Sequence, residues 1–320
     1  MEMLKSIALL LLPLSAASFF VPSTYRKESL SRLAASIEIN EKTAKELTDK
    51  SAIVTGASSG LGKALALQLA KCDMKKIVLS GRNMDSLQDV KEQCDALNSQ
   101  CEFHVLPCDL SDIEASKKFA KDALSKCNDN VDVLVLCGGM SSRSSFLESS
   151  YEVDEMLMKV NFLSGSAISK EIVPSMVDKG SGSIIWISSV QGLIGTPYRT
   201  SYAASKFAVQ GYCEALRSEL TSSGISVHCV SPGYISTNLS LNAANGDGSS
   251  YGKMDQTTAN GANPNQVAGE ILNNVFSKGK SDFVVAAGFS ATAAIILKFF
   301  APKFLEQKLV KRFLKAQKNE

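Results

Sequence analysis

The sequence has few of the residues that a metal site needs. Its 320 residues include only two histidines, and its eight cysteines form no Cys-x-x-Cys pair. Zinc and similar metals require several nitrogen or sulfur ligands at close spacing, and His104 and His228 both fall in segments expected to be strands. We therefore expect no metal. We expect the cysteines to be free buried thiols, although their even number leaves disulfides open in a secretory compartment.

Charge of one sign and internal repetition are also scarce. Thirty-four lysines and arginines nearly balance thirty-two acidic residues, so the net charge is only +2. A nucleic-acid-binding chain usually shows a basic excess, so we expect no nucleic-acid partner. The sequence shows no repeat or low-complexity tract. With 45% apolar residues, its length suits one α/β domain of about 250 residues with flanking segments.

A glycine-rich turn stands near the front of the chain. Ser51–Thr55 is a short apolar run typical of a strand, and Gly56, Gly60 and Gly62 follow it. Residues 63–70 then carry apolar residues every three to four positions, which predicts a helix. Glycines in this setting permit a tight turn and let backbone N–H groups approach a pyrophosphate at the helix end. We therefore expect a dinucleotide at this turn.

A tyrosine and a lysine four residues apart form the second motif. Tyr202 and Lys206 would share one face of a helix, and Ser189 lies thirteen residues before the tyrosine. A free phenol titrates near pH ~10, and an adjacent ammonium lowers that value. This predicts Tyr202 as a general acid/base and Ser189 as a hydrogen-bond donor to the same substrate oxygen. The pair alone is common on surface helices, so the interpretation depends on the glycine turn.

The two motifs, in this order and about 140 residues apart, resemble the short-chain dehydrogenase/reductase family over about residues 46–288. The resemblance implies an oxidoreductase whose catalytic residues are Asn161, Ser189, Tyr202 and Lys206. In it, Asn161 holds a proton-relay water beside the lysine. It also implies a set of contacts to a nicotinamide cofactor. These are Gly56, Ser58, Ser59, Gly60, Leu61, Arg82, Asp109, Leu110, Gly138, Tyr202, Lys206, Pro232, Gly233, Ile235 and Thr237.

One segment departs from the family pattern. Where the family usually has Asn-Asn-Ala-Gly after the fourth strand, this chain has Leu136-Cys137-Gly138-Gly139. The glycines keep the close approach of the backbone, but both asparagine amides are lost.

The coenzyme preference can be argued from charge at the end of the second strand. Enzymes that use NAD commonly have an acidic residue there, which binds the ribose 2′-hydroxyl. Here Gly81 takes that place and Arg82 follows it. A guanidinium favours a 2′-phosphate through charge-assisted bonds, so we expect NADP(H).

Strand-like and helix-like segments alternate along the chain. This alternation predicts an α/β fold with a single Rossmann-type, doubly wound parallel sheet and helices on both faces. Long helices are expected at Asp154–Val177 and Ser201–Ser222. They resemble the family's dimer face, which implies a homo-oligomer, either a dimer or a tetramer. The expected strands are Ser51–Thr55, Lys76–Ser80, Glu102–Leu106, Val131–Leu136, Ser183–Ser188, Ser226–Val230 and Asp282–Ala286.

The N-terminus resembles a targeting leader. Leu4 to Leu14 is an apolar run of signal-peptide length, short for a membrane span, so we expect residues 1–22 to be a signal-like segment that enters the secretory pathway. Phe19 and the acid-poor stretch after it resemble the bipartite leader of plastid proteins in algae with secondary plastids. Residues 23–45 are accordingly expected to be a transit-like or linker segment. A plain secretory signal or an uncleaved anchor in the ER membrane is the alternative.

The C-terminal residues 289–320 pass from an apolar stretch to a basic one. Such a pattern is typical of a helix at a membrane surface, so we expect peripheral membrane contact through this tail. In the family such tails also form lids or dimer faces. The basic residues are Lys308, Lys311, Arg312, Lys315 and Lys318.

The segment after Pro232-Gly233 and the run Gly138–Ser144 resemble the dehydrogenase/reductase member 7 subgroup, and most its B-type member. This implies a lipophilic ketone, aldehyde or alcohol, such as an acyl- or alkyl-dihydroxyacetone phosphate, a steroid or a retinoid. A plastid 3-ketoacyl-carrier reductase is an alternative that would need a basic docking patch. A cofactor-binding scaffold without catalysis is another, although the complete catalytic set argues against it.

Overall fold

The structure is a computed structural model that describes residues 39–317. The predicted signal-like segment and most of the transit-like segment lie outside the described residues. The packed fold begins earlier than the expected residue 46. A helix, α3 (Glu41–Leu47), starts at Asn40, whose side chain accepts a 2.9 Å hydrogen bond from the N–H of Thr43. Thr43 and Leu47 are buried, so this helix belongs to the domain.

Seven parallel strands form one sheet in the order β3-β2-β1-β4-β5-β6-β7. The predicted α/β, doubly wound fold is therefore confirmed. The order reverses direction between β1 and β4, where ligands bind in such sheets. The strands are β1 (Ser51–Thr55), β2 (Lys76–Leu79), β3 (Glu102–Val105), β4 (Val133–Leu136), β5 (Gly182–Ile187), β6 (Ile225–Pro232) and β7 (Asp282–Val285).

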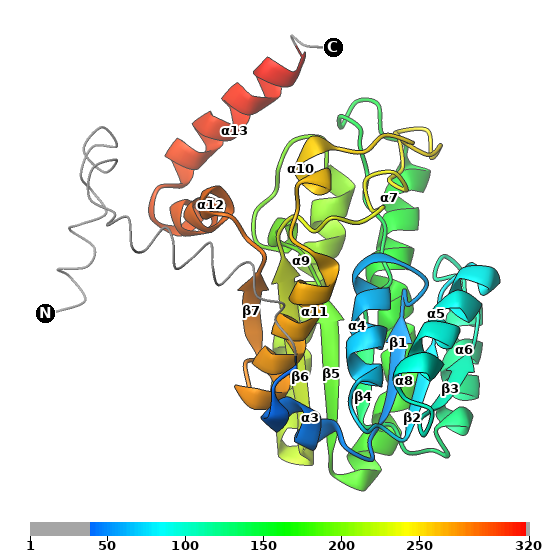
Figure 1. The fold of residues 1–320 in the computed structure, drawn as a ribbon. Helices are drawn as coiled ribbons and strands as arrows, with labels where there is room; N and C mark the ends of the chain where they lie inside the picture. The colour runs from blue at the N-terminus through cyan, green and yellow to red at the C-terminus, as the bar shows by residue number, and fades with distance from the viewer. Residues whose placement is uncertain (1–38, 318–320) are drawn as a thin grey trace, which may run out of the picture. The chain divides into compact units, whose positions relative to one another are not determined.

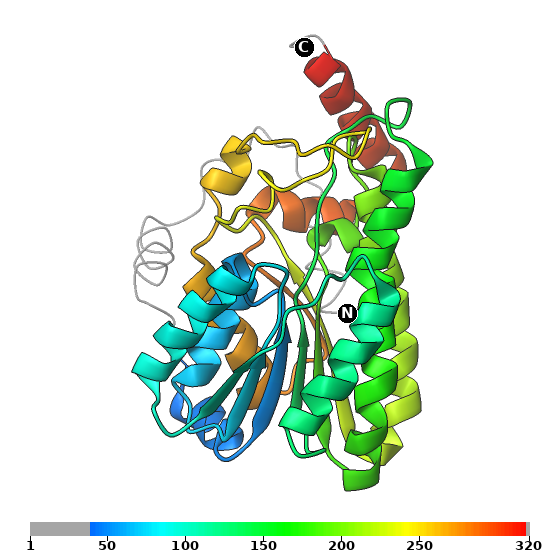
Figure 2. The ribbon, with the colours of Figure 1, turned by 90° about the vertical axis from the view of Figure 1, so that its right-hand side faces the viewer.

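Helices cover both faces of this sheet (Figure 2). On one face lie α4 (Gly60–Ala70), α5 (Met84–Leu97) and α11 (Pro264–Leu272). On the other lie α6 (Ile113–Lys126), α8 (Ser164–Lys179) and α9 (Thr200–Leu220).

Each face of the sheet has its own hydrophobic core. In β1, Val54 packs into the core beside α4, and its neighbour Ile53 packs into the core beside α8. Both are fully buried, because successive side chains of a strand point to opposite faces. This is why the strands read as continuous apolar runs.

The long helix expected at Asp154–Val177 has three parts. It begins as α7 (Tyr151–Met158), passes through a π-helical turn at Lys159–Leu163 and continues as α8. Such π-turns inside α-helices are rare and frequent at functional sites. Asn161 lies at the centre of this one.

The carboxyl ends of the strands point toward α10 (Gln256–Ala259) and the C-terminal helices (Figure 1). These helices are α12 (Phe289–Phe300) and α13 (Pro302–Gln317). None of the described residues of α12 is buried, whereas Leu305 of α13 is. Within residues 39–317, no helix has the length and apolar character needed to cross a membrane.

Candidate active site

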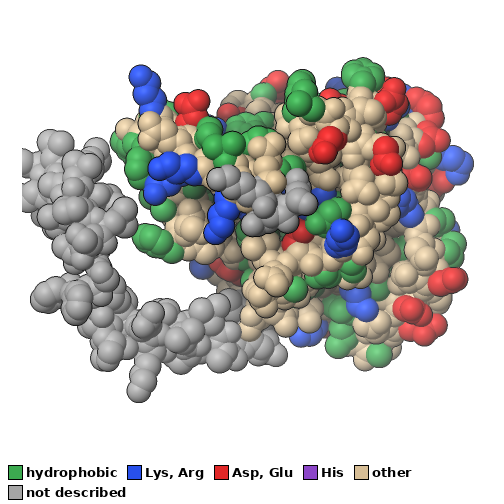
Figure 3. Space-filling view, turned by 90° about the horizontal axis from the view of Figure 1, so that it is seen from above, with side chains coloured by type: hydrophobic (Ala, Val, Ile, Leu, Met, Phe, Trp, Pro, Cys, Tyr) green, Lys and Arg blue, Asp and Glu red, His purple; other side chains and the backbone are tan. Residues whose placement is uncertain are grey.

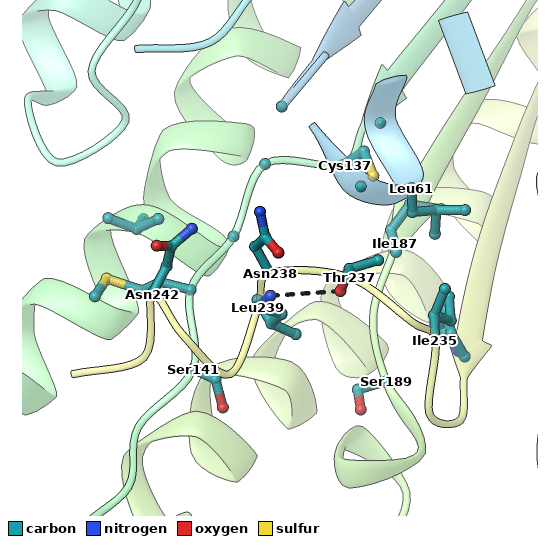
Figure 4. A pocket seen from close by; sticks show the side chains of 18 of the residues that line it. Leu61, Cys137, Ser141, Ile187, Ser189, Ile235, Thr237, Asn238, Leu239 and Asn242 are labelled. Carbon is teal, nitrogen blue, oxygen red and sulfur yellow. Dashed lines mark hydrogen bonds between the residues drawn. The ribbon is translucent and has the colours of Figure 1, made fainter. Parts of the chain in front are cut away.

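A cavity of about 290 Å³ opens at the carboxyl ends of the central strands. Every residue predicted to contact a cofactor lines it, and so does Ser189. Figure 4 shows Thr237, Asn238 and Leu239 on the segment that follows β6, with Ser141 and Ser189 on two other loops. The fold thus brings together residues as far apart in the chain as Gly56 and Thr258.

The glycine turn is shaped by its lack of side chains. Gly56 and Gly60 have φ values of 69° and 55°, which favour glycine. A Cβ on Gly62 would lie 2.2 Å from the carbonyl oxygen of Gly56. Helix α4 begins at Gly60, and Ser59 makes no capping bond with its side chain, so the positive end of the helix faces the cavity. This cradle fits a pyrophosphate.

The loop that departs from Asn-Asn-Ala-Gly is held by the strand beside it. The hydroxyl of Thr55, at the end of β1, accepts hydrogen bonds from the N–H groups of Cys137 and Gly138 at 3.1 and 3.2 Å. A Cβ on Gly138 would stand 2.2 Å from Cδ1 of Leu110. The loop after β4 is therefore held by a threonine and needs glycine at its tip.

Arg82 extends freely at one end of the cavity. It is exposed, and it forms no ion pair or hydrogen bond with any residue between 39 and 317. A Cβ on Gly81 would lie 3.1 Å from Cβ of Ser58, so an acidic side chain at this position would crowd the glycine turn. Asp109 stands nearby and accepts two 2.9 Å hydrogen bonds from Ser111.

Tyr202 lies on α9 and packs against Val153 and Leu157 of α7. It is 7% exposed, and burial raises the pKa of its phenol. The Ser189 hydroxyl beside it lowers that pKa by hydrogen bonding, and the charges of Arg199 and Arg143 also lower it. Burial outweighs these opposing effects, so the pKa of Tyr202 is raised overall and not lowered as expected.

Lys206 is buried one turn further along α9. Its ammonium donates a 2.9 Å hydrogen bond to the carbonyl oxygen of Ile187 and lies 5.9 Å from the ring centre of Tyr202. Burial lowers the pKa of Lys206 to about 8. A lysine of this kind gains and loses a proton near neutral pH.

Asn161 does not line the cavity but lies directly behind it. Its Nδ2 donates 2.9 Å bonds to the carbonyl oxygen of Met140 and to the hydroxyl of Ser205, and its Oδ1 accepts a 2.8 Å bond from the N–H of Met140. Both amide hydrogens are therefore in use. The side chain fixes the loop after β4, and it can contact a water only as an acceptor.

Comparison with known proteins agrees with this geometry. The family model for short chain dehydrogenases matches residues 50–247. Dehydrogenase/reductase SDR family member 7B of Danio rerio is 43% identical over 260 residues, 80% of this chain and 83% of that one. The chain belongs to the short-chain dehydrogenase/reductase family. A dehydrogenase/reductase SDR family protein 7-like of Drosophila melanogaster is 39% identical over 282 residues, which cover 88% of this chain and 85% of that protein. The predicted resemblance to the member 7 subgroup is therefore confirmed.

Solved structures share the fold of this dehydrogenase/reductase. A short-chain dehydrogenase/reductase of Burkholderia phymatum in complex with NAD has a TM-score of 0.69 and 20% identity, covering 81% of this chain and 96% of that one. An alcohol dehydrogenase of Thermococcus sibiricus with 5-hydroxy-NADP has a TM-score of 0.62 and 23% identity, covering 74% and 95%.

Two arginines that line the cavity were not predicted as site residues from the sequence. Arg143, on the loop after β4, and Arg199, just before α9, both line the cavity and both bind Asp255. Arg199 stands three residues before Tyr202, a helical spacing that could have drawn attention to it. No local pattern connects Arg143 with an aspartate 112 residues away.

The cysteines and histidines can be placed in the fold. All eight cysteines are free thiols, seven of them buried. His104 and His228 lie in β3 and β6 as predicted. Residues 39–317 contain no cluster of three or more His, Cys, Asp or Glu side chains suited to a metal.

Proposed function

We propose that this protein is an NADP(H)-dependent oxidoreductase that reduces the carbonyl group of a lipophilic substrate, or oxidises the matching alcohol. The observation that carries the proposal is the convergence of Ser189, Tyr202 and Lys206 on the cavity that the glycine turn and the unpaired Arg82 also line. Membership of the short-chain dehydrogenase/reductase family supports the same reaction class.

The residues at the glycine end would hold the cofactor. The backbone of the Gly56–Gly62 turn suits its pyrophosphate, and Arg82 suits a 2′-phosphate. Thr237 sits against Gly60, since its Cγ2 would lie 3.2 Å from a Cβ there, so the segment after β6 closes over the turn. When bound, a nicotinamide cofactor supplies the hydride for the carbonyl carbon.

Tyr202 donates the proton in this reaction. Because burial raises its pKa, the phenol keeps its proton at neutral pH and is ready to give it to the carbonyl oxygen. Ser189, whose hydroxyl accepts a 3.1 Å bond from the N–H of Gln191, donates its own hydrogen to the same oxygen. Lys206, with a pKa of about 8, is suited to return a proton to the tyrosine. Asn161 positions the loop that carries Gly139 and Met140 beside them.

The central test is a turnover assay with the Tyr202→Phe variant. NADPH oxidation should be followed over ketolipids, steroids, retinals and acyl-carrier thioesters. Loss of the proton donor should lower kcat by about 10²- to 10⁴-fold while NADPH binding, followed by fluorescence, stays intact. Tyr151→Phe, at a site 74% exposed, is the matched control. Full turnover by Tyr202→Phe would refute the mechanism, and a wild type inactive on every compound would favour the scaffold alternative.

The coenzyme proposal has its own variant. Loss of a charge-assisted bond costs about 1.5–3 kcal/mol, so Arg82→Ala should weaken the apparent affinity for NADPH roughly 10- to 100-fold. The affinity for NADH should change little. Equal use of NADH and NADPH by the wild type would contradict the role given to Arg82.

We also propose peripheral membrane contact through α12 and α13. Seen from above, on the face where these helices lie, hydrophobic and Lys or Arg side chains lie together over α13 (Figure 3). Phe289, Phe299 and Phe300 are 88, 73 and 78% exposed, and an apolar surface next to a basic helix suits anionic lipid.

Sedimentation with vesicles tests this contact. Removal of the chain after Gly288 should abolish binding to vesicles that contain anionic lipid, and binding of the full chain should fall with salt. Unchanged binding of the truncated chain would end the membrane proposal. Faster reduction of an acyl-carrier thioester than of free lipids would assign the basic helix to an acidic carrier protein instead.

A further inference from the structure

A cluster of buried polar side chains lies next to the catalytic lysine. Gln210 stands on α9, one turn after Lys206. Its Nε2 donates hydrogen bonds to the hydroxyls of Ser188 and Ser231 at 3.0 and 2.7 Å, and its Oε1 accepts one from the thiol of Cys229 at 3.2 Å. These three partners are 3% exposed or less. Both amide hydrogens of Gln210 are therefore used inside the protein.

The hydroxyl of Ser188 connects this amide to the catalytic lysine. It donates a 3.1 Å hydrogen bond to the carbonyl oxygen of Lys206, and because a hydroxyl has one hydrogen, it acts as the acceptor for Gln210. The ammonium of Lys206 bonds to the carbonyl oxygen of Ile187, the residue before Ser188. Both the main chain and the side chain of Lys206 are thus fastened to the end of β5.

The loop after Ser189 covers this contact. A Cβ on Gly192 would lie 2.6 Å from Oγ of Ser188 and 2.7 Å from the carbonyl oxygen of Lys206. Only a glycine lets the loop pack this closely on the bond between Ser188 and Lys206. Ser189, which starts that loop, therefore has its position set by the same contact.

A second branch of the cluster reaches the segment after β6. Ser231 lies in β6, and Pro232 and Gly233, which follow it, line the cavity. Cys229 lies in the same strand, so two of the three partners of Gln210 are side chains of β6. Gln210 thus joins α9, the end of β5 and β6 at the edge of the sheet where the catalytic residues lie.

We propose that Gln210 is a positioning residue, which fixes Lys206 relative to Ser189 and to the segment that begins at Pro232. Packing alone does not require such a cluster, because replacing hydrogen-bonded partners by apolar groups of the same shape can be nearly neutral for stability. Catalysis does require fixed distances, since a misplacement of about 1 Å can lower a rate about 10²-fold. The inference rests on the proposed function and adds to it a residue that does not line the cavity.

A purely structural role would give a different result. If Gln210 only stabilised the fold, its loss would lower the free energy of unfolding and leave the kcat of the folded protein unchanged. If it positions Lys206, kcat should fall at temperatures where the variant is fully folded. The KM values should change little, because Gln210 does not line the cavity. A split between kcat and KM therefore separates the two roles.

The kinetic test uses Gln210→Met, which keeps the length of the side chain and removes its hydrogen bonds. With NADPH and the ketone that the wild type reduces fastest, kcat should fall about 10- to 100-fold. Ser188→Ala should lower kcat as well. The double variant should lose little more than the worse single variant, because both changes break one chain of hydrogen bonds. Gln68→Met is the matched control, since Gln68 is 4% exposed on α4 and its amide donates to the carbonyl oxygen of Asn265 at 3.4 Å. This control should leave kcat unchanged. An unchanged kcat in Gln210→Met, or losses that multiply in the double variant, would overturn the proposal.

A titration of Lys206 separates this inference from the proposed function. Its ammonium can be followed by nuclear magnetic resonance in protein that contains carbon-13-labelled lysine, with Lys206→Met to assign the signal. Burial lowers the pKa of Lys206 to about 8, so loss of its attachment should let water reach the ammonium and move the pKa toward 10.5 in Gln210→Met. If the wild type reduces none of the compounds, the proposed function fails, but this rise would still support the positioning role. In that case an unchanged pKa would reject the positioning role as well.

Discussion

The catalytic site and the C-terminal helix α12 are packed in different ways. Around Tyr202 and Lys206, the side chains are less than 9% exposed, and buried hydrogen bonds tie Asn161 and Lys206 to the backbone. In contrast, α12 has no buried residue among those described, and its phenylalanines are open to solvent. The difference indicates that the catalytic residues are held by tightly packed elements, whereas α12 packs loosely against the domain.

The largest effect expected from this comparison is at Asn161. Asn161→Ala removes three hydrogen bonds and leaves the N–H and carbonyl groups of Met140 without their partner at a site 4% exposed. Unpaired buried groups cost about 1–3 kcal/mol each, so the free energy of unfolding should fall by about 3 kcal/mol or more. Urea denaturation followed by circular dichroism measures this.

The matched control for Asn161 is Asn265→Ala. Asn265 is exposed on α11, and its side chain makes no hydrogen bond within residues 39–317. Its loss should change the stability by less than about 0.5 kcal/mol. Similar losses of unfolding free energy in the two variants would mean that the buried surroundings of Asn161 are no more rigid than the surface.

The strands, the glycine turn and the pair of Tyr202 and Lys206 could be predicted from the sequence. Each strand is a short apolar run, and every predicted strand is present within a few residues of its expected bounds. The glycine turn could be recognised because its positive φ values and close backbone contacts exclude other residues. Tyr202 and Lys206 share a face of α9 because a spacing of four residues is nearly one turn.

Long-range partners could not be predicted in this way. Asp255 meets Arg143 and Arg199 only because the chain folds, and no periodicity connects residues more than fifty positions apart. The π-turn at Asn161 and the hydrogen bonds of Thr55 to the loop after β4 also depend on tertiary contacts. The pKa of Tyr202 was misjudged because spacing gives proximity to Lys206 but not the degree of burial.

A smaller effect concerns the burial of Lys206 and is visible in the pH dependence of stability. Burial lowers its pKa from 10.5 to about 8, so between these values the unfolded chain binds a proton that the folded chain does not. The contribution of this group to stability therefore rises with pH across that window. Relative to Lys206→Met, the wild type should gain about 2 kcal/mol between pH 7.5 and 10.

Denaturation at several pH values tests the prediction. The difference between wild type and variant removes the contributions of the cysteines, which both proteins share. Lys118→Met, at a lysine whose side chain is 78% exposed, should show no such dependence on pH. A constant difference between wild type and Lys206→Met would mean that the lysine stays charged in the folded protein.

The smallest effect on stability is expected where α12 contacts the loop between Ser189 and Tyr202. Lys298 of α12 donates a 2.7 Å hydrogen bond to the carbonyl oxygen of Leu193, and its ammonium lies 4.4 Å from the ring centre of Phe207 on α9. Leu193 belongs to the loop between Ser189 and Tyr202. Because Lys298 is only half-buried, Lys298→Met should lower the free energy of unfolding by about 1 kcal/mol. Its effect on KM for long-chain substrates should be larger than its effect on kcat.

Lys308→Met provides the contrast for this last variant. Lys308 lies on α13, where its ammonium is 5.2 Å from the ring centre of Phe304. If Lys298 couples the loosely packed tail to the rigid site, KM should rise in Lys298→Met and not in Lys308→Met. Equal KM values in both variants and the wild type would show that the tail and the catalytic loop act independently.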